Sequence, residues 1–162
     1  MLSRDGLQSV PFDLLHEAWN EYTFSDNVIV RLRLILMAVL QRYEFGPMTF
    51  ETKKVTVVSA PENLRGNPGE FEQDANLDVP RWECPILIRQ EKWNEYSLAG
   101  GELISKIIFI ANRAFKFENA FDKYGQPVYY MDGKILIKVY EKRNESSAKF
   151  LEGVTHPEGS SK

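Results

Sequence analysis

The sequence predicts a mainly β protein, all-β or α+β, in which two related β-meander repeats form a pseudo-twofold barrel or two packed sheets. The tetrapeptide Trp-Asn-Glu-Tyr occurs at 19–22 and again at 93–96. Runs of alternating apolar and polar residues follow both copies, and clusters of Gly, Pro, Asn and Asp separate them. Alternating runs bounded by such residues are typical of antiparallel strands.

The resemblance between the two stretches extends beyond the identical tetrapeptide. Superposed without gaps, Val30 falls on Ile104 and Leu34 on Ile108, and after an insertion in the second copy Lys54 falls on Lys134. We therefore predict an internal duplication; the competing interpretation is that any two β patterns align in this way. The predicted parts are 1–60 (helix and first repeat), 61–92 (linker), 93–143 (second repeat) and 144–162 (disordered tail), with the repeats packed as one domain.

The composition fits a globular protein without disulfides. Of 162 residues, 43% are hydrophobic and 27% charged, and the net charge is −3. A negative balance argues against broad electrostatic capture of nucleic acid. Cys84 is the only cysteine, which agrees with a reducing compartment. Because the longest apolar run, 34–40, is far shorter than the roughly 20 residues of a spanning helix, no membrane association is expected. The N-terminal residues Met1 to Val10 contain no apolar run of signal-peptide length, so a cytoplasmic protein is expected.

The N-terminal segment carries a helix pattern. Ser9 is a suitable N-cap, and Pro11 is tolerated at the first helical position. Phe12, Leu15, His16 and Trp19 then share one helical face, at spacings of three and four residues. This spacing predicts a short amphipathic helix packed on a sheet.

The first repeat is expected to open with a hairpin. The turn-forming cluster 25–27 separates 22–24 from a long run that begins at Val28. Apolar residues alternate from Val28 to Leu36, and the opposite face also becomes apolar halfway along, which predicts a strand covered on both sides at its far end. A helix over 32–43 is the alternative, because that segment is rich in helix formers. Gly46-Pro47 ends the run, and 54–59 is expected to be a further strand.

The linker and the second repeat follow the same logic. Residues 61–70 are rich in helix and strand breakers, and the acidic stretch from Glu70 to Asp78 is expected to be a solvated loop; calcium binding is the alternative, although no EF-hand spacing is present. A short strand is expected within 80–90. In the second repeat, Gly100-Gly101 marks the first turn, and Asp132-Gly133 predicts a type I′ hairpin between 128–131 and 134–140.

Residues able to support catalysis are sparse. The only histidines, His16 and His156, lie far apart in the sequence, and Cys84 has no neighbouring base, so it is expected to be a buried thiol. Neither a phosphate-binding loop nor a metal-ligand pattern is present, so no cofactor or metal is predicted. The remaining catalytic hypothesis is a pair of carboxylates, Glu21 and Glu95, brought together by a pseudo-twofold axis.

One segment combines aromatic and basic residues in the way that single-stranded nucleic-acid-binding surfaces do. The same residue types also form cross-strand pairs in antiparallel sheets. Nucleic acid is therefore an alternative partner rather than the expected one. The residues of this possible nucleic-acid or partner surface are Phe115, Lys116, Phe117, Lys123, Tyr124 and Tyr129.

The predicted function is that of a non-enzymatic structural or protein-interaction module that forms a homo-oligomer. Strands apolar on both faces expose one face unless the other repeat or another chain covers it. The alternatives are single-stranded nucleic-acid binding by a small β-barrel and a carboxylate-dependent enzyme. The repeated aromatic and acidic residues are interpreted as markers of where each repeat enters the core. These are Trp19, Glu21, Tyr22, Trp93, Glu95 and Tyr96.

Overall fold

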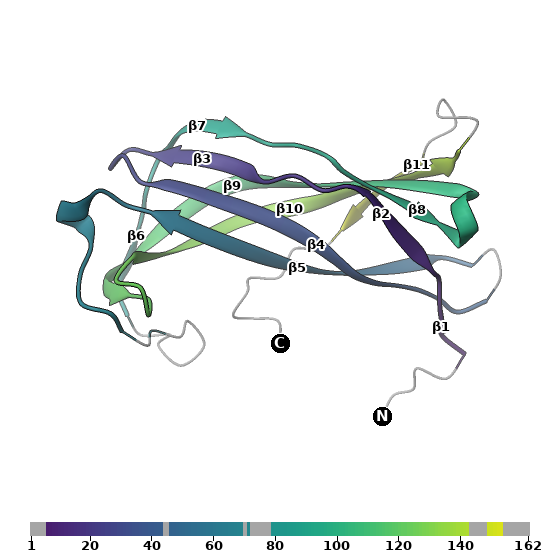
Figure 1. The fold of residues 1–162 in the computed structure, drawn as a ribbon, viewed down its shortest axis with the longest axis horizontal. Helices are drawn as coiled ribbons and strands as arrows, with labels where there is room; N and C mark the ends of the chain where they lie inside the picture. The colour runs from purple at the N-terminus through teal and green to yellow at the C-terminus, as the bar shows by residue number, and fades with distance from the viewer. Residues whose placement is uncertain (1–5, 44–45, 70, 72–78, 143–148, 154–162) are drawn as a thin grey trace.

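The protein is mainly β and consists of two antiparallel sheets (Figure 1), as the sequence predicts. The computed structural model describes residues 6–43, 46–69, 71, 79–142 and, for the backbone, 149–153. Sheet A contains β1 (Gln8–Ser9), β3 (Asn20–Phe24), β4 (Ile29–Gln41), β5 (Met48–Ser59) and β7 (Ile86–Gln90). Sheet B contains β2 (Phe12–His16), β6 (Arg81–Glu83), β8 (Asn94–Leu98), β9 (Leu103–Phe121), β10 (Pro127–Glu141) and β11 (Lys149–Gly153).

The two sheets are assembled in similar ways around their long strands. In sheet A, β4 pairs along one edge with β5 and along the other with β1 and β3, and β7 pairs with β3. In sheet B, β9 pairs along one edge with β10 and along the other with β6 and β8, and β2 pairs with β8. Sheet B has one additional strand, β11, on the outer edge of β10.

The long apolar runs are strands, so the helical alternative for 32–43 is wrong. In β3 and β8 every second side chain is buried, and the same alternation continues in β4 through Val30, Leu32 and Leu34. These buried side chains fill the space between the sheets together with Phe109 and Ile107 of β9. Each such side chain contributes roughly 1.5–3 kcal/mol through burial. The core therefore depends on residues from both halves of the chain.

The predicted N-terminal helix is a strand. Residues 12–16 form β2, which pairs with β8 with a register shift between Leu14 and His16. Among the described residues, the helical segments are short 3-10 turns at Glu62–Leu64 and Ala99–Gly101. A spacing of three and four residues over so short a segment also fits a strand with a bulge, and backbone pairing with a segment about eighty residues away decides between the two.

The predicted type I′ hairpin at Asp132-Gly133 is also wrong. β10 continues through both residues, and the register shift between them marks a bulge opposite β9. A Cβ atom on Gly133 would lie 2.3 Å from the Ile110 carbonyl oxygen and 2.6 Å from the Phe109 ring. Glycine is present there because the two strands approach closely, and not because the chain turns. The hairpin turn between β9 and β10 lies instead at 122–126.

Three predictions for the linker and the tail are corrected or fall on residues outside the described ranges. The expected short strand within 80–90 is two strands, β6 and β7, which belong to different sheets. Residues 149–153, predicted to be part of a disordered tail, form β11. Most of the acidic stretch from Glu70 to Asp78 and the remainder of the tail, with His156, lie outside the described residues.

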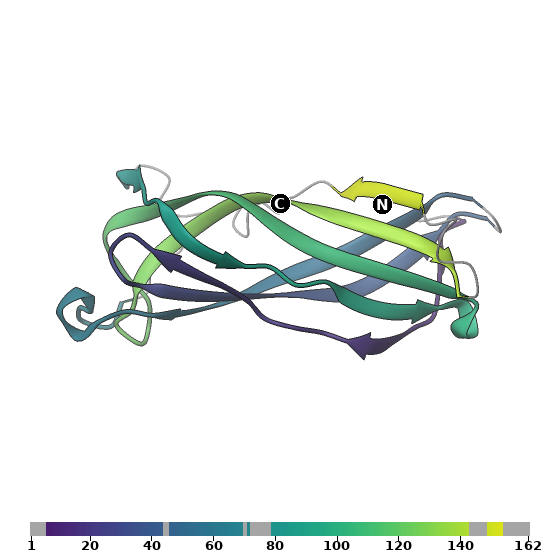
Figure 2. The same ribbon diagram turned by 90° about the horizontal axis from the view of Figure 1, so that it is seen from above.

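The short strands that precede each Trp-Asn-Glu-Tyr segment lie in the sheet opposite to the one that the segment enters. β2 lies in sheet B and leads to β3 in sheet A, whereas β7 lies in sheet A and leads to β8 in sheet B. Figure 2 shows the two connecting segments passing close to each other near the middle of the molecule. At these two places, which we call the crossings, the chain passes from one sheet to the other in opposite directions.

Strand pairing also corrects the ungapped superposition of the two halves. Tyr22 lies opposite Val30, and Tyr96 lies opposite Ser105. Val30 therefore corresponds by pairing to Ser105 and not to Ile104. The difference of one residue arises in the turns, because the connection between β8 and β9, measured from these pairs, is one residue longer than the connection between β3 and β4.

Candidate functional site

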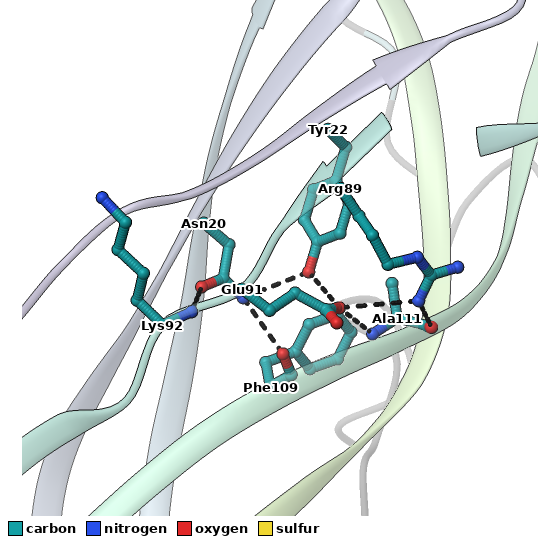
Figure 3. A network of polar contacts seen from close by, with 7 residues as sticks. All are labelled: Asn20, Tyr22, Arg89, Glu91, Lys92, Phe109 and Ala111. Atoms are coloured by element: carbon teal, nitrogen blue, oxygen red, sulfur yellow. Dashed lines mark hydrogen bonds and ion pairs between the residues drawn. The ribbon is translucent and has the colours of Figure 1, made fainter. Parts of the chain in front are cut away.

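The Trp-Asn-Glu-Tyr segments lie at the two crossings, where buried polar side chains form hydrogen-bonded networks between the sheets. In the first network (Figure 3), the Glu91 carboxylate accepts hydrogen bonds from the Tyr22 hydroxyl at 2.8 Å and the Ala111 amide at 2.7 Å. Asn20 donates to the Phe109 carbonyl at 3.0 Å and accepts from the Lys92 amide at 2.8 Å. Each of these contacts joins residues that are distant in the sequence.

Arg89 completes the first network from the edge of sheet A. One guanidinium nitrogen donates to the Ala111 carbonyl at 2.6 Å and lies 3.7 Å from the Glu91 carboxylate. Both backbone groups of Ala111 are therefore bonded by side chains of the crossing segment. These side-chain bonds hold β9 to β7 at a place where, among the described residues, the two strands do not pair through their backbones.

The second network is the counterpart of the first. The Tyr96 hydroxyl donates to the Glu17 carboxylate at 2.5 Å, and Arg33 donates to the same carboxylate at 2.9 Å. Asn94 donates to the Leu34 carbonyl and accepts from the Ala18 amide, both at 2.8 Å. Asparagine and tyrosine thus make the same contacts in both networks, whereas the second donor to the glutamate differs: it is the Ala111 amide for Glu91 and the Arg33 side chain for Glu17. In each network the glutamate comes from the opposite half of the chain to the asparagine and tyrosine.

The sequence analysis did not identify Glu17 and Glu91 as residues of these networks. Each lies two residues before a repeated tryptophan, so the repeated pattern is Glu-x-Trp-Asn-Glu-Tyr and not the tetrapeptide alone. The signal was present in the sequence one position beyond a mismatch, Ala18 against Lys92. The first glutamate of this pattern contacts the network, and the second does not.

Burial keeps the network tyrosines neutral. Desolvation is the main cause that raises the pKa of Tyr22 well above its ordinary value, and the hydrogen bond to Glu91 raises it further. The pKa of Tyr96 is raised for the same reasons, with Glu17 as its partner. Hydroxyl groups held in the donor state beside a carboxylate suit a structural hydrogen bond. In this state they are poor general bases at neutral pH.

The structure does not bring Glu21 and Glu95 together. Glu21 alternates with inward-facing Asn20 and Tyr22 in sheet A and forms an exposed ion pair with Arg31 at 3.0 Å. Glu95 alternates in the same way in sheet B, where it lies opposite Lys106. The two carboxylates therefore lie on the outer faces of different sheets. The repeated tryptophans are partly buried, and the guanidinium of Arg33 lies 5.5 Å from the Trp19 ring centre.

The residues of the predicted nucleic-acid surface are divided among three places. Phe117 is buried beneath Phe71, and Phe115 stacks on Tyr130 with Arg81 and Arg113 over its ring. On the opposite face, the Tyr129 hydroxyl donates to Asp26 at 2.6 Å, and the Lys116 ammonium lies 3.8 Å from the same carboxylate. Lys123 and Tyr124 lie in the exposed β9–β10 turn. The six residues of the predicted surface therefore do not form one continuous surface.

The remaining candidate side chains form no cluster with these. Cys84 is buried, and burial raises the pKa of its thiol. His16 is exposed on β2 opposite Glu95. Within the described ranges, no group of three or more His, Cys, Asp or Glu side chains is arranged to hold a metal ion. The described residues also contain no helix of the length and apolarity needed to span a membrane.

The networks hold the two sheets together, and their carboxylates are already occupied by protein donors. Glu17 and Glu91 have side-chain exposures of 10% and 12%, so a substrate has little access to either group. Comparisons with family models, curated protein sequences and solved structures found no significant match. The assignment of a function therefore depends on the geometry of this chain.

Proposed function

We propose that this protein is a non-enzymatic interaction module that associates with itself through sheet A. The observation that carries the proposal is the outer edge of β5, which pairs with no strand in the described part of the chain. An unpaired strand edge presents a row of backbone donors and acceptors and pairs readily with another strand. We call the backbone edge of Met48–Ser59 that faces away from β4 the β5 edge.

The composition of β5 supports this proposal. Its second half, Lys54 to Ser59, contains four β-branched residues in succession from Val55 to Val58. Val57 lies on the outer face opposite Arg31 and is 45% exposed. Exposed β-branched residues on an unpaired edge favour strand addition.

Further apolar residues are exposed on the outer side of sheet A. Ile88 of β7, which lies opposite Thr23, and Met37 of β4 are both more than half exposed. In sheet B the corresponding long strand, β9, has buried residues on both faces, among them Ile104 and Ile108. The outer face of the long strand is thus less covered in sheet A than in sheet B, although Leu14 and Trp82 on shorter strands of sheet B are also about half exposed. This difference is consistent with the use of sheet A as an interface.

We also propose that the two halves of the chain are an internal duplication related by a pseudo-twofold axis. The reciprocal networks support this relation, because Glu17 contacts Tyr96 and Glu91 contacts Tyr22. The strands β2 and β7 also support the pseudo-twofold relation, because each lies in the sheet opposite to the strand that follows it in the chain. A chain built in this way reproduces internally the reciprocal contacts of a homodimer.

Sedimentation equilibrium over a wide concentration range tests the self-association. We expect the mean mass to rise from the chain mass of 18.7 kDa toward twice that value or more as concentration increases. A strand-edge contact is a small interface, so micromolar rather than nanomolar affinity is expected. A mass that stays at that of one chain up to near-millimolar concentration contradicts the proposal.

Single-stranded nucleic-acid binding is the second candidate, and one feature favours it. Arg81 and Arg113 lie over Phe115 on the outer face of sheet B, where Phe115 stacks on Tyr130. The negative net charge and the ion pair between Arg113 and Glu83 oppose it.

Retention of a labelled oligonucleotide at low salt separates this candidate from the first. Nucleic-acid binding predicts salt-sensitive retention that Arg81→Glu abolishes and that Lys92→Glu, a charge reversal at the crossing, preserves. The absence of retention by the unmodified protein at low salt excludes it.

A further inference from the structure

The partner of the β5 edge can be identified more closely, on the basis of the self-association proposed above. We propose that β5 of one copy pairs antiparallel with β5 of a second copy, with the twofold axis passing through Thr52. Sheet A of each copy would then continue into sheet A of the other. The contact is isologous and closes at two chains.

The equivalent edge of sheet B shows what kind of segment fits such a position. The Leu34 carbonyl accepts from Asn94, and the Phe109 carbonyl accepts from Asn20. Leu34 and Phe109 therefore occupy equivalent places in the two sheets. Lys54 lies opposite Leu34, and Ile135 lies opposite Phe109, so Lys54 is the equivalent of Ile135.

In sheet B this position is covered by an antiparallel strand. β11 pairs with β10 along the five residues from Ile135 to Val139. The equivalent stretch of β5 begins at Lys54 and ends at Val58. An extended antiparallel strand is therefore the expected occupant of the β5 edge, and in a second copy β5 itself has its edge unpaired among the described residues.

Strand geometry limits the possible registers of this contact. A twofold axis perpendicular to the sheet keeps the outer faces of both copies on the same side. Residues that face the same way must then lie opposite each other, so the axis passes through a residue rather than between two residues. Glu51 and Lys53 both belong to the outer-facing set, because they lie opposite Ala38 and Ile35 of β4.

Charge then selects one register. An axis through Glu51 places that carboxylate opposite its own copy, and an axis through Lys53 or Lys54 does the same for an ammonium group. Like charges directly opposite each other destabilise an antiparallel pair. An axis through Thr52 alone pairs opposite charges, because it places Glu51 opposite Lys53 twice in each dimer; it also leaves Met48 opposite Thr56. This register explains how an edge that carries an exposed lysine is able to self-associate.

Charge reversal tests the register directly. Glu51→Lys places a second ammonium group opposite Lys53, and Lys53→Glu places a second carboxylate opposite Glu51, so each single substitution converts two attractive pairs into two repulsive pairs. We expect each to raise the dimer dissociation constant by about tenfold or more. The double variant Glu51→Lys/Lys53→Glu restores two attractive pairs and should return the constant to near that of the wild type. Sedimentation equilibrium provides the measurement, and thermal melting confirms that each variant is folded.

The controls separate this inference from the self-association on which it depends. Glu118→Lys changes the net charge of the protein as Glu51→Lys does, at an exposed site on β9, and should leave the dimer unchanged. Wild-type protein that is monomeric at all concentrations refutes self-association itself. A wild-type dimer that neither single reversal weakens refutes the proposed β5 contact and leaves self-association itself standing. Dissociation in both single variants without recovery in the double variant refutes the register through Thr52.

Discussion

At the scale of single residues, two glutamates organise the centre of the molecule. Glu91 accepts from a buried tyrosine hydroxyl and from a backbone amide of the opposite sheet, and Glu17 binds Tyr96 and Arg33 in the equivalent place. A buried donor that loses its acceptor costs about 1–3 kcal/mol. The stability of the crossings therefore depends strongly on these two carboxylates.

Glu91→Ala is expected to lower the free energy of unfolding by about 2–4 kcal/mol, because both the Tyr22 hydroxyl and the Ala111 amide lose their acceptor. The matched control is Glu21→Ala, which removes an exposed ion pair with Arg31 and should cost about 0–1 kcal/mol. Urea denaturation at one fixed protein concentration measures both. Equal losses for the two variants would show that the network is not a main source of stability.

The buried tyrosines predict a loss of stability at high pH. Burial raises the pKa values of Tyr22, Tyr96 and Tyr129 above that of an unfolded tyrosine, about 10. Below that pH both the folded and the unfolded chain keep these protons, so the stability is unaffected. Above it the unfolded chain loses protons that the folded chain retains, so the free energy of unfolding falls as pH rises, by up to about 1.4 kcal/mol per pH unit for each tyrosine.

Denaturation midpoints measured from neutral to strongly alkaline pH, with phenolate absorbance recorded in parallel, check this dependence. Tyr22→Phe should make the alkaline decline shallower, although it also lowers stability at neutral pH. A midpoint that stays constant well above pH 10 would contradict the raised pKa values.

At the scale of elements, the predictions succeeded where local pattern decides and failed where distant pairing decides. The alternation from Val28 to Leu36 predicted β4 because one buried face imposes a period of two residues. The pattern over Phe12 to His16 fitted a helix, and only pairing with β8 makes it a strand. Gly133 has the sequence context of a turn, yet its role depends on its approach to β9, which the local sequence does not reveal.

Gly133→Ala tests the close approach of β10 and β9 at the bulge. The added Cβ meets the Ile110 carbonyl and the Phe109 ring, so the backbone must shift, and we expect a loss of about 1–3 kcal/mol. Gly100→Ala is the comparison, since its Cβ would meet nothing within 4 Å and its positive φ of 72° alone costs about 1 kcal/mol. Chemical denaturation of both variants measures the difference, and a neutral Gly133→Ala would refute the steric explanation.

At the scale of the whole molecule, the repeated tetrapeptide marks the two hydrogen-bonded networks between the sheets and was a poor indicator of chemistry. Its asparagine and tyrosine face the interior, whereas Glu21 and Glu95 face outward on different sheets, so the carboxylate pair proposed from the sequence has no shared site. The partners Glu17 and Glu91 were missed because each is separated from the identical residues by a position that differs between the copies. The β5 edge, which pairs with no strand among the described residues, was not predicted at all, because β11 extends sheet B and not sheet A.

Amide-resolved hydrogen exchange in β5, measured by NMR, tests the proposed self-association most directly. Successive amides of a strand point to opposite edges, so in a monomer only those that face β4 are protected. Self-association through β5 predicts that both sets of amides between Met48 and Thr56 are protected in the wild type at high concentration, and that the outward set loses protection in Glu51→Lys. Rapid exchange of the outward set in the wild type at every concentration would contradict it.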